Sequence, residues 1–224
     1  SWDDSKRRNF LKKYLWGAEQ GKEYIQGDND ISNTLKAQQY NNIFTWIKPI
    51  ISDYNLNKII EIGTGEGIFL SIIKNNFRDR KDINYTGVDL NNKLIAIAQK
   101  KNKNDSNINF TVADGNEFLQ KKNYNNSLFI YVATLQYFTP LEIKEHFNLI
   151  SKFKDSYILL YEPINIDLKN QLSSKPRGRG AYSHNYIKLA EKYKLEIIKS
   201  KITPLSKEDY LYQSITLMLK STFD

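Results

Sequence analysis

The order of apolar and polar positions divides the chain into two parts with different patterns. Near the N-terminus, a charged segment at residues 4–14 predicts a helix, and a polar turn follows at Gly27–Ser32. A second, amphipathic helix is expected after this turn, because apolar side chains recur there at steps of four, three and four. Its apolar stripe consists of Tyr40, Phe44, Ile47 and Ile51.

From Lys58 onwards, short β-branched or apolar runs alternate with helical patterns, which is typical of a parallel sheet covered by helices. The expected strands are Lys58–Ile62, Asn84–Asp89, Asn107–Val112, Ser127–Val132 and Tyr157–Tyr161, the last stopped by Pro163. Helices are expected at residues 68–74, 94–101 and 141–153. Residues 195–202 and 210–219 look like two more strands, joined by a polar loop, that close one sheet edge as an antiparallel pair.

The predicted fold class is therefore α/β: a doubly wound, Rossmann-like sheet of seven mainly parallel strands with a C-terminal antiparallel pair. We expect a single domain over residues 1–224, with an N-terminal helical cap at residues 1–54 and the core at residues 55–224. No apolar stretch approaches the ~18 residues that span a bilayer, so we expect no membrane span and a cytoplasmic protein.

Composition narrows the chemistry further. The chain has no cysteine, which excludes a disulfide scaffold, a Cys-ligated zinc site and a Cys nucleophile. Its two histidines, His146 and His184, are too few for a multi-His metal centre, and we expect no metal. The formal net charge of +8 indicates either an anionic partner or the lysine enrichment that a low-GC genome produces. The oligomeric state is not predicted.

A glycine-rich turn directly follows the first strand, at Gly63–Gly67. Such a turn lets the backbone approach a ligand closely at the carboxyl end of the sheet. A dinucleotide fingerprint requires glycine at the sixth position, which here is Ile68, and no Gly-Lys-Ser/Thr follows to make a P-loop. The glycines instead occupy the first, third and fifth positions, and Glu61 lies two residues upstream.

This arrangement resembles the first motif of the class I S-adenosylmethionine-dependent methyltransferases, acidic-x-Gly-x-Gly-x-Gly, on Glu61, Gly63, Gly65 and Gly67. The resemblance implies that the turn wraps the methionine part of S-adenosylmethionine and that Glu61 contacts its amino group. The further cofactor-binding residues that it implies are Thr64, Leu90, Gly115, Val132 and Ala133.

Two more carboxylates follow from the resemblance. Asp89, at the end of the second strand, is expected to accept both ribose hydroxyls, and Asp114, after the third strand, to reach the adenine amino group. Each carboxylate has a structural alternative. Glu61 would pair with a lysine, Asp89 would cap a helix, and Asp114 would belong to an ordinary Asp-Gly turn.

Catalysis and acceptor binding are expected around the ends of the fourth and fifth strands. His184 is a candidate general base, with the alternative that Ser183 or His184 caps the helix that runs to Lys192. Glu162 would orient the acceptor or act as base, a structural carboxylate being the alternative, and Tyr137 is the third catalytic candidate. His146 is expected to be structural.

The expected substrate-binding residues are Gln136, Arg177, Arg179, Tyr14, Trp16 and Tyr24. The two arginines lie in a segment, Lys175–Gly180, that we expect to be a flexible basic loop able to hold a phosphate or carboxylate, or else simply a solvated loop. The three aromatic residues would form a lid, with ordinary packing as the alternative.

These features predict a methyltransferase that acts on a small, anionic metabolite by in-line transfer to oxygen or nitrogen. A sugar, a nucleotide sugar or another phosphorylated compound would fit, and the Leu135–Phe138 stretch is loosely similar to surface-polysaccharide methyltransferases. The alternatives are an RNA methyltransferase and a non-catalytic protein of the same fold. Nucleic acid is not the expected partner, because the Asn/Asp-Pro-Pro-aromatic signature of amino-methylating relatives is missing after the fourth strand.

Overall fold

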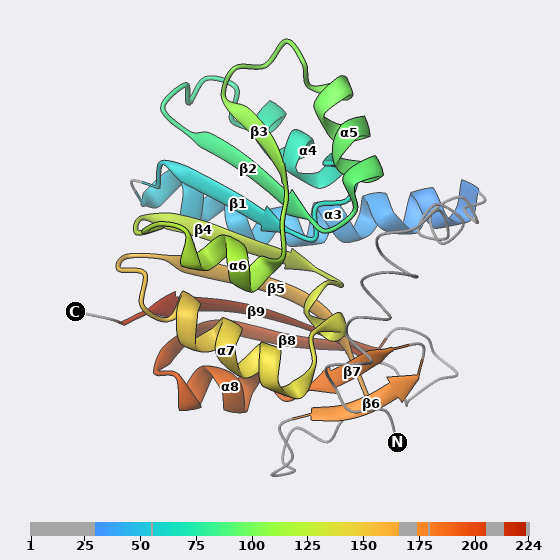
Figure 1. Cartoon of the computed structure of the whole chain (residues 1–224), viewed down its shortest axis with the longest axis vertical. Coiled ribbons are helices and arrows are strands. Elements are labelled where there is room, and N and C mark those ends of the chain that lie inside the picture. The colour runs from blue at the N-terminus through green and yellow to red at the C-terminus, as the bar shows by residue number, and fades with distance from the viewer. Residues whose placement is uncertain (1–29, 55, 166–173, 179, 205–212, 223–224) are drawn as a thin grey trace.

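Seven strands form one twisted sheet in the computed structural model, which describes residues 30–54, 56–165, 174–178, 180–204 and 213–222 (Figure 1). The strand order is β3-β2-β1-β4-β5-β9-β8. The strands are β1 (Lys58–Ile62), β2 (Asn84–Asp89), β3 (Ile108–Val112), β4 (Ser127–Val132), β5 (Tyr157–Ile164), β8 (Leu195–Pro204) and β9 (Gln213–Ser221). The first five are parallel, and β9 pairs antiparallel with both β5 and β8. The predicted fold class is confirmed.

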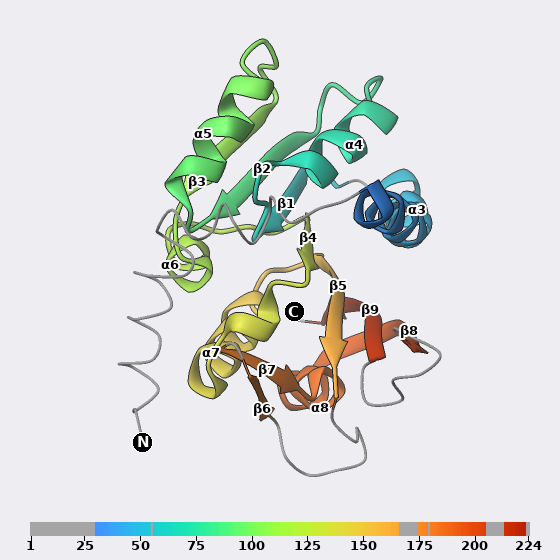
Figure 2. The same cartoon turned by 90° about the vertical axis from the view of Figure 1, so that its right-hand side faces the viewer.

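Helices cover both faces of this sheet. On one face lie α3 (Asp30–Asp53), α4 (Ile68–Asn76) and α5 (Asn92–Lys101), and on the other lie α6 (Gly115–Gln120), α7 (Pro140–Ile150) and α8 (Tyr186–Lys192). Figure 2 shows α3 and α7 on opposite sides of the strands. Each face has its own apolar core. Because side chains alternate along a strand, Ile130 of β4 faces α3 while Tyr131 faces α7.

The predicted apolar stripe of α3 packs onto the sheet. Ile47 and Ile51 are fully buried, and Tyr40 and Phe44 are half-buried at the same core. Asp30–Ser32, expected in a turn, are helical. The predicted helix at residues 4–14 lies outside the described residues, and the division into cap and core stays a prediction.

The fifth strand continues through Pro163 to Ile164, which corrects the expectation that this proline ends it. The Ala133 N–H donates to the Tyr161 carbonyl, so the backbone groups of Tyr161 face the β4 side. By alternation, the nitrogen of Pro163 faces the same side, beyond the end of β4 at Val132. Among the described residues no strand pairs with this side of Pro163, so no N–H is required there and the proline is tolerated.

The basic segment expected to be a flexible loop is largely a strand. Ser174–Gly178 forms β6, which pairs antiparallel with β7 (Ala181–His184) in a separate two-stranded sheet. This hairpin lies against β5 and η2 (Leu135–Tyr137), a short 3-10 helix after β4. The Lys-Pro-Arg-Gly sequence of β6 has no strand pattern of its own. This segment forms a strand because it pairs with β7, whose positions are buried. Among the described helices, none is long and apolar enough to cross a membrane.

Candidate functional site

The glycine turn between β1 and α4 can be built only from glycine at two of its positions. Gly63 has a φ of 79°, and a Cβ there would lie 2.1 Å from Thr134 Oγ1. Gly67, the N-cap of α4, has a φ of 72°, and a Cβ there would lie 2.4 Å from Phe110 Cε1. A side chain at either position would meet both backbone strain and a clash. The turn is therefore packed tightly between Phe110 of β3 and Thr134 after β4.

Glu61 is buried directly below this turn. Its Oε2 accepts a hydrogen bond of 2.7 Å from Thr64 Oγ1, and no ion pair involves it among the described residues, so the lysine alternative is not observed. Burial raises the pKa of the Glu61 carboxyl to about 8. Burial, and after it the charge of Glu61, raises the pKa of Tyr40 on α3 to about 12. A buried carboxylate without a cation fits the ammonium group of a methionine moiety.

Asp89 ties the end of β2 to the glycine turn. Its Oδ2 accepts from the Gly65 N–H at 2.9 Å, and its Oδ1 accepts from the Asn91 N–H at 2.9 Å. The helix-cap alternative is not what the structure shows, because Asn91 caps α5. Burial raises the pKa of Asp89. Beside it, the Leu90 side chain is partly exposed and offers an apolar surface at the same edge.

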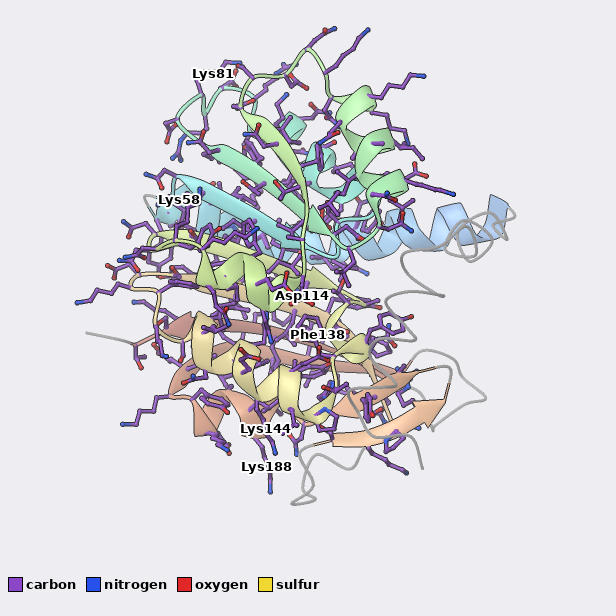
Figure 3. All side chains as sticks on the ribbon, viewed as in Figure 1. Lys58, Lys81, Asp114, Phe138, Lys144 and Lys188 are labelled. Atoms are coloured by element: carbon purple, nitrogen blue, oxygen red, sulfur yellow. The ribbon has the colours of Figure 1, made fainter. Side chains whose placement is uncertain are left out.

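Asp114 lies at this edge too and caps a helix that the sequence analysis missed. Its Oδ1 accepts from the N–H groups of Asn116 at 2.9 Å and Glu117 at 3.3 Å, which starts α6 at Gly115. The Asp-Gly pair is therefore a helix start rather than an ordinary turn. A Cβ on Gly115 would lie 3.1 Å from Phe138 Cζ, and Figure 3 shows Asp114 and Phe138 together, far from Lys58 at the start of β1.

A buried polar network around His146 lies next to the start of α6. His146 Nδ1 lies 2.6 Å from Asn116 Oδ1, and its Nε2 lies 2.6 Å from the Tyr131 hydroxyl. Burial lowers the pKa of His146 to about 3, so the neutral ring donates to Asn116 and accepts from Tyr131. The ring links α6, α7 and β4, in agreement with the expected structural role.

The segment after β4, Ala133–Gln136, forms a wall between the glycine turn and Arg177 on β6. Ala133 has a φ of 53° and is exposed, Val132 is half-buried, and η2 follows. The buried Glu162 carboxylate accepts from the N–H groups of Thr134 and Leu135, both at 2.8 Å, and of Gln136 at 3.3 Å.

This geometry corresponds to the structural alternative for Glu162, since each of these partners is a backbone N–H of one turn. Burial raises the pKa of Glu162 to about 7, against the lowering effect of these hydrogen bonds and of the Arg177 charge. Tyr137, the third catalytic candidate, lies in η2 and is half-buried.

His184 is fully buried and bonded through both ring nitrogens. Its Nε2–H donates to the Phe138 carbonyl at 3.0 Å, and its Nδ1 accepts from Ser174 Oγ at 2.7 Å. Burial lowers the pKa of His184 to about 4, so the ring is neutral near pH 7. The cap of α8 is Asn185, whose Oδ1 accepts from the Lys188 N–H at 3.1 Å, so neither Ser183 nor His184 is the cap. The chain enters α8 one residue later than the pattern indicated.

Of the expected acceptor-side residues, the structure brings two together. Arg177 Nη1 on β6 donates to Gln136 Oε1 and to the Pro163 carbonyl, each at 3.2 Å. The other expected residues, Arg179, Tyr14, Trp16 and Tyr24, lie outside the described residues. Within the described part of the chain, no group of three His, Asp or Glu side chains is placed to hold a metal ion.

Thr134 is the site residue that sequence reasoning passed over. Its side chain lies against Gly63, and its backbone N–H donates to the Glu162 carboxylate. Thr134 therefore connects the glycine turn to the segment after β4. A signal was present, since Thr134 is the second residue after a strand in the middle of the sheet, at the edge where ligands bind in such folds.

The comparisons with known proteins agree with this geometry. Residues 59–153 match the family model described as a methyltransferase domain, while no curated protein sequence matches the chain. The magnesium protoporphyrin IX methyltransferase of Synechocystis, solved with bound S-adenosylhomocysteine, is 17% identical with a TM-score of 0.66, over 96% of this chain and 100% of that chain.

Two other solved structures share the fold. Geranyl diphosphate C-methyltransferase from Streptomyces coelicolor, solved with Mg²⁺, geranyl diphosphate and S-adenosylhomocysteine, is 10% identical with a TM-score of 0.65, over 85% of this chain and 80% of that chain. The [4+2]-cyclase SpnF is 10% identical with a TM-score of 0.67, over 84% and 82% of the two chains. Residues 59–153 therefore match a methyltransferase domain, and the chain shares the fold of solved methyltransferases, one of which was solved with bound S-adenosylmethionine.

Proposed function

We propose that the protein transfers the methyl group of S-adenosylmethionine to a small, anionic acceptor. The observation that carries this proposal is the meeting of two sets of residues at one sheet edge. The glycine turn with Glu61 and Asp89 would hold the cofactor, and Gln136 with Arg177 would hold the acceptor on the other side of the wall after β4. A guanidinium beside an amide is suited to carboxylate or phosphate oxygens.

When bound, the cofactor supplies a methyl group activated by the sulfonium. In-line transfer would join an acceptor lone pair to the methyl carbon as the carbon–sulfur bond breaks, with that electron pair left on sulfur. The protein's part is alignment: the glycine turn and Asp89 would fix one partner, and Arg177 the other. In-line geometry then depends on the wall between them.

The hydrogen bonds of His184 and Glu162, the two candidate bases, bear on which kind of acceptor atom we propose. His184 has both ring nitrogens bonded, and the Glu162 carboxylate faces three backbone N–H groups, so neither is placed to take a proton from an acceptor. We therefore propose an acceptor that is already nucleophilic near neutral pH, such as a carboxylate or phosphate oxygen. The neighbours named above as methyltransferases of magnesium protoporphyrin and of geranyl diphosphate support a small-molecule acceptor, and the proposal extends no further toward polysaccharides.

The test is a screen of anionic metabolites for formation of S-adenosylhomocysteine. Arg177→Ala should raise the KM of an accepted metabolite by about tenfold or more, because a charge-assisted bond is lost, while S-adenosylhomocysteine affinity changes much less. Arg177→Lys separates the charge from the guanidinium geometry. Lys175→Ala, an exposed cation on the same strand, is the matched control. An unchanged KM in Arg177→Ala would refute the acceptor assignment.

A further inference from the structure

The Glu162 side chain occupies an anion-binding turn of its own chain. Ala133 is left-handed and Thr134 is right-handed, with φ of −108° and ψ of −48°. Alternating left- and right-handed residues direct successive N–H groups to one side, which makes a nest for an anion. Here the N–H groups of Thr134, Leu135 and Gln136 all donate to the Glu162 carboxylate from β5. The nest is filled by the protein itself.

We propose that Glu162 is a positioning residue, an internal anion that folds Ala133–Gln136 into the wall that sets the distance between cofactor and acceptor. The catalytic consequence rests on the proposed function, but the fold of the wall does not. This role differs from that of a base, since a base would direct its carboxylate at the acceptor.

Two residues of the nest contact the two parts of the proposed site, Thr134 on the cofactor side and Gln136 on the acceptor side. Thr134 is pressed against Gly63, where a Cβ on the glycine would lie 2.1 Å from Thr134 Oγ1. Two residues later, Gln136 Nε2 donates to the Ala133 carbonyl at 2.9 Å, and its Oε1 accepts from Arg177 at 3.2 Å. A shift of the nest would therefore move the cofactor turn and the acceptor arginine relative to each other.

Two features of this arrangement are energetically unfavourable. Ala133, an alanine rather than a glycine, is in the left-handed region, and a carboxylate is fully buried. Three N–H donors and the positive charge of Arg177 offset both costs. Such strain persists only where the surroundings over-determine it, and it is common where a site must be preformed. Within the described part of the chain, the other titratable groups that face Glu162 are Tyr131 on β4 and Tyr186 on α8.

The experiment compares amide hydrogen exchange and S-adenosylhomocysteine affinity in Glu162→Gln and in Glu142→Gln. Glu142 is another buried glutamate that caps the N-terminus of α7, and glutamine serves equally well in that capping box. We expect exchange at residues 134–136 to rise by about tenfold in Glu162→Gln and S-adenosylhomocysteine affinity to fall by about tenfold, because one of the carboxylate oxygens becomes an N–H donor. Glu142→Gln should match the wild type in both. Ala133→Gly added to Glu162→Gln should recover part of the affinity, since it relieves the left-handed strain.

The outcomes separate this inference from the proposed function. If wild type binds S-adenosylhomocysteine and Glu162→Gln keeps both its amide protection and its affinity, the positioning role is wrong. If wild type does not bind, the cofactor site fails while the exchange data still decide the role of Glu162. Should Glu162→Gln not fold, a pH titration of the wild type replaces it. The amide proton resonances of Thr134 and Leu135 must then move together with the carboxyl carbon of Glu162, and their independence would overturn the inference.

Discussion

At the residue scale, the buried carboxyl of Glu61 links ligand binding at the glycine turn to pH. Its pKa of about 8 means that it is mostly protonated near pH 7 in the ligand-free protein. An ammonium group placed beside it would favour the carboxylate and expel the proton. Cofactor binding and proton release are therefore expected to be linked.

This linkage can be measured with S-adenosylhomocysteine. At pH 7 we expect nearly one proton released for each ligand bound, and an affinity that rises by up to about tenfold per pH unit between pH 6 and 8. Calorimetry in two buffers of different ionisation enthalpy gives the proton count. Glu61→Gln should bind with almost no proton release. Equal heats in the two buffers for the wild type would contradict the assignment of Glu61.

The same pKa shift makes a prediction for stability. Since the pKa of Glu61 is raised from 4.5 to about 8, the folded state holds the proton more tightly than the unfolded state. Stability from this group is complete below about pH 4.5 and is lost as the pH rises toward 8. The wild type should therefore lose unfolding free energy between pH 5 and pH 8. Glu61→Gln lacks this titration, so its loss over the same range should be smaller by at least about 1 kcal/mol. Urea unfolding at both pH values tests this, and parallel curves would count against a protonated Glu61.

Sequence patterns predicted the backbone around the glycine turn better than the side-chain contacts of the wall. Gly63 directly follows β1, and Asp89 ends β2, as the patterns indicated. The partners of Glu162 and His184 were not predictable, because a buried side chain that bonds to a remote backbone leaves no periodic signal.

At the scale of elements, prediction succeeded where apolar runs set the structure. β1, β2 and β4 begin and end at the expected residues, because each is buried by helices on both sides. The hairpin β6–β7 and the short helix α6 were missed, since tertiary packing and the Asp114 cap, rather than an apolar pattern, form them. Pro163 led to a wrong prediction of the end of β5. Its nitrogen faces a side on which no described strand pairs with it, and the sequence pattern does not show this.

One element-level prediction concerns the start of α8. Asn185→Ala should lower the free energy of unfolding by about 1 kcal/mol, because the Lys188 N–H loses its acceptor in a buried position. Asn185→Ser, which keeps a capping oxygen, should recover most of this loss. Thermal or urea unfolding measures both variants. No loss in Asn185→Ala would place the cap elsewhere.

At the scale of the whole molecule, two cores share one sheet, and the residues assigned to the ligands gather at its carboxyl edge. The formal charge of +8 allows either a small anion or a nucleic acid as partner. We expect acceptor binding to depend only weakly on salt, because a small anion displaces few counterions. A steep fall in RNA binding with salt, accompanied by methyl transfer to RNA, would instead support the alternative function.

The central claim is that the carboxyl edge of the sheet binds the cofactor, and two aspartates near opposite ends of β2 test it directly. Asp89 bonds to the glycine turn, whereas Asp82, just before the start of β2, pairs with Arg80 in solvent. Calorimetry with S-adenosylhomocysteine should give a micromolar dissociation constant for the wild type and for Asp82→Ala, and binding about tenfold or more weaker in Asp89→Ala. Equal affinity in Asp89→Ala, or no binding by the wild type, would contradict the account.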